Sequence, residues 1–411
     1  MASAQRRGLR REISAVNVSA ALLEPAGVGL AAALQPANLV VLAAGVLFGA
    51  LASWLTGWAR PVVWLALLAP FAQVLEPLAG VAMLVGVLSG AAACSGPFDA
   101  RHLVWTFGLT LAVGMVMALI APWLGPLFRG FKSVDRVWLS AAAMVGAGGL
   151  AWAAASVARD AGQRRWLAPV LLLTGVVGGA GVTAGFANAP DKARLDISLV
   201  ALGLLALGPA AAVLTGRRDL LGSMRSDHPL TVLPWIALGL PMTAAAALMA
   251  DALFGHGLVA GPQTLMSRPK IGWGIWAAIL MAGLLAFALA AALARVRLSP
   301  SVQRQRIIAG LVLLGVIAMS AWRGTATGDV VVLATAALVG YACARFDIDP
   351  SPLIVGLVLA ELGVLDFERA LRAGGVAGLI SQAQWLPVMI CVTASGLVAW
   401  LVRRREPEAV R

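Results

Sequence analysis

The residues best suited to chemistry lie in one apolar stretch, Leu233–Pro262. Gly239 and Pro241 should break a helix there, because proline lacks an N–H and clashes with the preceding turn. Within a membrane, backbone groups freed by such a break are tolerated only where protein or a wet cavity satisfies them. The break therefore predicts a binding site for a transported ligand, with Thr243 starting a fresh helix over Met242–Phe254. The competing interpretation is a kinked helix that holds no ligand.

Asp251 lies about three turns beyond this break. A carboxylate inside a membrane is costly and usually functional, so Asp251 is the candidate ion-coupling residue, for Na⁺ or H⁺. Two carboxylates at contact distance repel each other, so Asp251 would not touch an anionic substrate. It would instead neutralise a coupling cation. The alternative places Asp251 at the outer end of its helix, in water, near His256.

A second apolar stretch near the N-terminus combines glycine with a hydroxyl group, at Gly49, Thr56 and Gly57. Small residues spaced in this way, like Gly86 and Gly90 downstream, are also typical of close helix packing. Packing is therefore the competing interpretation for this stretch.

The two stretches stand in the two halves of the chain, where inverted-repeat transporters place paired discontinuous helices around one midplane site. We predict that Thr56 and Thr243 supply hydroxyls to one shared cavity. Gly57 and Gly239 would let the backbone approach the ligand, because glycine tolerates conformations that other residues do not.

The elements that position these residues must be membrane helices. The chain has 411 residues, of which 60% are hydrophobic and 12% charged, and its mean hydropathy is +0.89. The fold class is all-α and polytopic, with about 12–14 continuous apolar segments of the kind that cross a bilayer. We expect one integral membrane domain over 1–411, no soluble domain, and two pseudo-repeated halves, 13–165 and 166–402, with broken or re-entrant helices. The expected segments are Ile13–Leu34, Ala37–Leu55, Val62–Leu75, Leu78–Cys94, Leu103–Pro122, Val137–Ala158, Trp166–Ala184, Ile197–Leu214, Leu230–Phe254, Gly272–Leu293, Ile307–Trp322, Val330–Ala344, Leu353–Leu365 and Trp385–Val402.

The formal net charge of +12 comes mostly from arginine in short loops. If every apolar segment spans, five arginine clusters fall on one side, which predicts cytoplasmic N- and C-termini. This distribution favours membrane topology over nucleic-acid binding, which needs a basic, soluble surface. Histidines, cysteines and serines show no metal-binding or catalytic spacing, so the sequence does not indicate an enzyme. The clusters are Arg6 to Arg11, Arg159 to Arg165, Arg217 to Arg225, Arg295 to Arg306 and Arg403 to Arg405.

The stretch 238–262 also resembles a signature of the large permease subunit of tripartite tricarboxylate transporters. Residues 238–262 are similar to the family signature without a gap in the alignment. The similar positions include glycine, proline and histidine residues. The last helices, up to Arg372, and the order of small residues around Gly49 are similar as well. The residues that carry the resemblance in the signature are Gly239, Leu240, Pro241, Ala244, Ala247, Leu248, Ala252, Leu253, His256, Gly257, Leu258, Gly261 and Pro262.

The resemblance implies uptake of a carboxylate across a bacterial inner membrane, driven by a cation gradient and without another cofactor. It also implies a small membrane subunit and a periplasmic substrate-binding protein as partners. Transferred to this chain, the substrate-binding residues are Gly49, Thr56, Gly57, Gly239, Pro241 and Thr243.

The departures from the family pattern include two missing segments. The chain lacks ligand-bearing inserts after Asp99 and between Leu214 and Leu230. The cavity should therefore be shallower and the substrate smaller than citrate. The alternative is a shortened relative that no longer transports and has a structural or partner-binding role.

Overall fold

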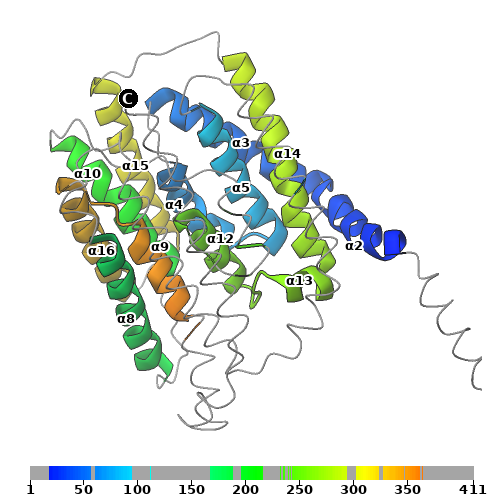
Figure 1. Cartoon of the computed structure of the whole chain (residues 1–411). Helices are drawn as coiled ribbons and strands as arrows, with labels where there is room; N and C mark the ends of the chain where they lie inside the picture. Colours follow the sequence, from blue (N-terminus) through cyan, green and yellow to red (C-terminus); the bar gives the residue numbers. More distant parts are fainter. Residues whose placement is uncertain are drawn as a thin grey trace, which may run out of the picture.

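The computed structural model describes residues 18–56, 61–94, 112, 167–187, 196–215, 232, 235–236, 239, 241, 243–293, 302–323, 327–346, 348–361 and 363. Within these residues the secondary structure is helical and contains no strand. Figure 1 shows the helices gathered into two groups, with two short helices between them. The expected all-α architecture is confirmed.

The first group packs around a long, apolar helix, α14. It contacts α2, α3 and α5, and these helices occupy one side of the view in Figure 1. The contact with α2 is close, because a Cβ atom on Gly29 would lie 2.3 Å from Trp273 Cβ. The members are α2 (Val18–Ala33), α3 (Pro36–Thr56), α5 (Pro77–Cys94) and α14 (Pro269–Leu293).

The second group packs around α16, which contacts a helix with an internal π turn. That interrupted helix runs through α9, η2 and α10, and α15 packs against η2 and α10. On the other side of the same group, α8 packs against the helix Ser351–Glu361. The members are α8 (Leu167–Ala187), α9 (Ile197–Ala201), the π-helix η2 (Leu202–Leu207), α10 (Gly208–Leu214), α15 (Val302–Arg323) and α16 (Thr327–Arg345).

Two short helices join the groups. α4 (Pro61–Ala72) and α12 (Ala244–Phe254) contact each other, and both also contact α5 and α9. Their 12 and 11 residues give lengths of about 18 and 16 Å, well short of the ~30 Å of bilayer hydrocarbon. A helix that is apolar on every face is stable only when buried. Ten of the eleven α12 residues are in fact buried.

Five described helices are long and apolar enough to cross a membrane. This confirms a multi-pass membrane protein, and the expected segment Ile197–Leu214 has the same ends as one of these spans. The expected segments over 137–158 and 385–402 lie outside the described residues, and so does 103–122 except for residue 112. The long helices are Pro36–Leu55, Pro77–Cys94, Ile197–Leu214, Pro269–Leu293 and Gly328–Arg345.

Interlocked glycines hold α3 against α5. A Cβ atom on Gly45 would lie 2.4 Å from Met83 O, and one on Gly49 would lie 2.2 Å from Val87 O. The partners advance by four residues on both helices, so α3 and α5 run parallel. The intervening chain, which includes α4, must therefore return across the protein. From the sequence alone, the short segments Val62–Leu75 and Leu78–Cys94 could form either two spans or a hairpin. The parallel arrangement of α3 and α5 favours two crossings.

The π turn η2 was not expected from the sequence. Pro209 has no N–H to give to the carbonyl four residues earlier. The neighbouring Gly208 N–H instead bonds to Gly203 O, five residues back. Both glycines pack on the backbone of α16, with a Cβ on Gly208 reaching within 2.4 Å of Gly340 C.

Candidate functional site

The predicted helix break is present. Trp235 and Ile236 are helical, and the Gly239 N–H donates to Trp235 O at 2.7 Å. Gly239 then adopts a left-handed φ of +79°, and Thr243 is extended at φ −131° and ψ 158°. The next helix starts at Ala244, two residues later than the expected Met242, because Thr243 caps it from outside the helix.

Gly239 lies against the chain that follows α12. A Cβ atom there would lie 2.5 Å from Ala260 O, and Gly239 itself is buried. Pro241 is buried as well. The break therefore forms one packed unit with the segment after α12, where Gly261 has a φ of +131° and precedes α13 (Pro262–Ser267).

The Thr243 hydroxyl has a structural partner. Its Oγ1 accepts a hydrogen bond from the Ala246 N–H at 3.3 Å, which satisfies one of the free donors at the start of α12. The side chain is half-buried. Thr243 therefore acts as an N-cap, and its predicted contact with a substrate stays a prediction.

Replacing Thr243 should test its role as a cap. Thr243→Val removes the cap and should lower the free energy of unfolding by about 1 kcal/mol, whereas Thr243→Ser keeps it. Unfolding of the purified protein in mixed detergent micelles measures the difference. Equal stability of the two variants would show that the cap contributes nothing.

Asp251 is the buried charge of the site. Only 2% of its surface is exposed, although it lies one turn from the end of α12. Its Oδ2 accepts a hydrogen bond of 2.7 Å from the Nε2 of Gln73. The alternative that placed Asp251 in water is therefore wrong, because α4 and its following turn cover this part of α12. His256 is exposed on the turn after α12.

Gln73 is the site residue that sequence reasoning missed. It follows the last residue of α4 and is half-buried. The available signal was an amide at the end of the apolar run Val62–Leu75. Nothing in the sequence linked it to a carboxylate 178 positions away.

The described site brings together two short helices that each follow a predicted break. α4 starts at the buried Pro61, soon after Thr56 and Gly57, and α12 starts at the buried Ala244. Their C-terminal ends meet at the hydrogen bond between Gln73 and Asp251. A helix N-terminus carries partial positive charge and free N–H groups, which suit an anion.

The other predicted site residues are placed as follows. Gly49 is in the α3–α5 interface, where the α5 backbone occupies the space of a side chain. This contact explains why the position carries glycine. Thr56 is the last residue of α3, and Gly57 lies outside the described residues. A cavity shared by Thr56 and Thr243 stays a prediction.

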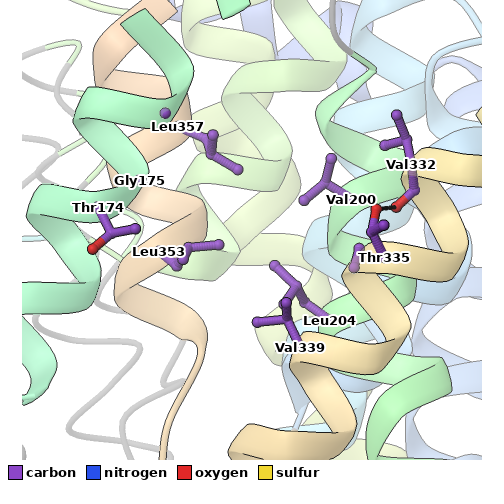
Figure 2. A pocket seen from close by; sticks show the side chains of 11 residues that line it. Thr174, Gly175, Val200, Leu204, Val332, Thr335, Val339, Leu353 and Leu357 are labelled. Atoms are coloured by element: carbon purple, nitrogen blue, oxygen red, sulfur yellow. Dashed lines mark hydrogen bonds between the residues drawn. The ribbon is translucent and has the colours of Figure 1, made fainter. Parts of the chain in front are cut away.

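A separate cavity of about 280 Å³ opens between α8, η2, α16 and the helix Ser351–Glu361. Figure 2 shows its apolar lining, with Leu204, Val339 and Leu357 among the side chains. Its hydroxyl groups serve the backbone: Thr335 donates to Val332 O at 3.0 Å, as Figure 2 also shows. None of the predicted site residues that the structure describes is part of its lining.

The sequence of this region is similar to a known transporter family. Residues 225–355 match the model of the tripartite tricarboxylate transporter TctA family. The resemblance to this family is confirmed. The matching segment contains the break, α12, Asp251 and the helices α13 to α16, whereas α4 and Gln73 precede it.

Two curated relatives match at the same level of identity. Both are uncharacterized proteins of Agrobacterium vitis, one encoded in the TAR-II ttuC' 3' region and one, of 52.8 kDa, in the TAR-I ttuC' 3' region. Each is 26% identical over 140 residues, which is 34% of this chain. The matches span 57% of the first relative and 28% of the second. No solved structure matches the chain.

Proposed function

We propose that the chain is the permease subunit of a secondary, cation-coupled carboxylate uptake system in the bacterial inner membrane. The observation that carries this proposal is the break at Gly239, which leads into the buried helix α12. It lies within the segment that matches the TctA family. A helix broken inside a membrane domain is where secondary transporters bind their substrates.

The proposed chemistry divides the two charges between two parts of α12. The carboxylate substrate would bind near the start of the helix, where the break leaves N–H groups outside the helical ladder and the helix dipole is positive. The coupling cation would bind at Asp251, two turns further along and covered by α4. Keeping the anionic substrate away from Asp251 avoids repulsion between carboxylates.

The proposed partners are a small membrane subunit and a periplasmic substrate-binding protein. Apolar side chains on α15 and α16, such as Leu311, Leu314 and Leu338, are 59%, 63% and 69% exposed. Such faces suit either lipid or another membrane helix. The second candidate function is a non-transporting, partner-binding subunit. It is favoured by the short connections after Asp99 and between Leu214 and Leu230.

Uptake into membrane vesicles tests the proposal. We expect vesicles from cells that express the chain with the products of its neighbouring genes to accumulate labelled succinate, a dicarboxylate smaller than citrate. Accumulation should collapse when the cation gradient is dissipated, because a secondary transporter has no other source of energy. Vesicles that lack only this chain are the control. If acetate, succinate and citrate all fail to accumulate above that control, the non-transporting role is correct.

A further inference from the structure

We infer that Asp251 is a proton-binding site and that Gln73 is the positioning residue that holds it. The inference rests on the proposed function, whose coupling ion it identifies as H⁺. It depends on the burial of Asp251, on the hydrogen bond from Gln73, and on the side chains that surround α12.

The neighbourhood of Asp251 suits a proton better than a metal cation. On α12, the residues one turn away are Ala247, Leu248, Phe254 and Gly255, which bring no side-chain oxygen. Hard cations need several oxygen ligands. Among the described residues, no group of three or more histidine, cysteine, aspartate or glutamate side chains could hold a metal ion. A proton needs only the carboxylate itself.

Within the part of the chain that the structure describes, few other titratable groups lie on the helices packed against α12. α4 carries no ionisable residue, and the cysteine of α5, Cys94, is at the opposite end of that helix from Gln73. α9 carries none, but Asp196 caps it by accepting from the Ser198 N–H at 3.0 Å. On the turns that follow α4 and α12, the described titratable groups are Glu76 and His256, and both are exposed. Single substitutions of Asp251, Glu76 and His256 can therefore show which of these three described groups titrates.

Protonation changes the contact between the two short helices. The ionised carboxylate accepts a charge-assisted hydrogen bond from the Gln73 amide, and such bonds are stronger than neutral ones. One proton added to one carboxylate oxygen gives a neutral carboxyl group and leaves a neutral bond. The end of α4 is then held less tightly to α12, so occupation by the proton changes how firmly the two helices are joined.

Infrared difference spectroscopy of the purified full-length chain tests the site without any substrate. Acidification should produce the C=O stretching band of a protonated carboxyl group that exchanges slowly with deuterated solvent. Asp251→Asn should abolish this band while keeping an oxygen that accepts from Gln73. Gln73→Leu should retain the band but shift its frequency and its pH midpoint, because the positioning donor is lost.

Glu76→Gln and His256→Gln are the matched controls, since they remove the exposed neighbours and should leave the band unchanged. A spectrum without an Asp251-dependent band would assign the carboxylate a structural role only. Thermal stabilisation by Na⁺ over K⁺ in the wild type, lost in Asp251→Asn, would identify Na⁺ as the ion and overturn the inference. The band in a chain that accumulates no carboxylate would uphold the proton site and refute the permease. Carboxylate uptake by a chain that lacks the band would uphold the permease and refute the proton site.

Discussion

Replacing Gly239 by alanine should lower the free energy of unfolding by about 2–5 kcal/mol and abolish uptake. Two effects add at this position. The left-handed φ of +79° is unfavourable for any residue with a Cβ atom. The new Cβ would also lie 2.5 Å from Ala260 O, a backbone atom that can move only with its chain. Unfolding in mixed detergent micelles measures the loss of stability, and uptake into vesicles measures the loss of transport.

Two nearby glycines separate the two effects. Gly257 has a φ of +67° but open space where a Cβ would lie, so Gly257→Ala should lose only the conformational part, about 1–2 kcal/mol. Gly255 is right-handed, with contacts no closer than 3.5 Å, and Gly255→Ala should be near neutral. If Gly239→Ala proved no worse than Gly257→Ala, the close approach of the break to Ala260 would be refuted.

Replacing Gly49 by valine should lower the free energy of unfolding by about 3 kcal/mol, because the α3 and α5 backbones must move apart. A single Cβ atom there would already lie 2.2 Å from Val87 O. Unfolding in mixed detergent micelles measures this loss. Gly90 lies in the same interface between α3 and α5, so Gly90→Val should lower the free energy of unfolding as well. A Cβ on Gly90 would meet Val46 O at 2.2 Å.

Gly283→Val is the matched control for this change. Gly283 is a helical glycine in α14 with nothing within 4 Å of a Cβ, so the same substitution should change stability by less than about 0.5 kcal/mol. A loss at Gly283 equal to that at Gly49 would mean that valine destabilises these helices through propensity, and that packing between α3 and α5 is not responsible.

Helix positions could be predicted from the sequence because continuous apolar runs have few alternatives in a bilayer. The ends of α5 and α14 lie within three residues of the expected ones. The π turn η2 was missed, because apolar composition carries no information on whether a carbonyl bonds four or five residues ahead. Pro209 was the available hint.

The candidate site was predicted only in part. The break at Gly239 and the choice of Asp251 as a candidate follow from local chemistry, since proline, glycine and a lone carboxylate are unusual in a membrane helix. The partner of Asp251 depends on a contact between helices 178 positions apart, which a single sequence does not reveal. Gly49 illustrates a different limit: a glycine needed for helix packing and one needed for a ligand are identical in sequence.

The parallel arrangement of α3 and α5 has a consequence for how the protein is inserted into its membrane. α4, with 12 residues, is about 18 Å long and too short for lipid alone to hold it across the bilayer. It is buried against α5 and α12, and α12 is synthesised more than 170 residues later. Biogenesis must therefore keep α4 at the insertion machinery, or under the cover of α3 and α5, until the second short helix has left the ribosome.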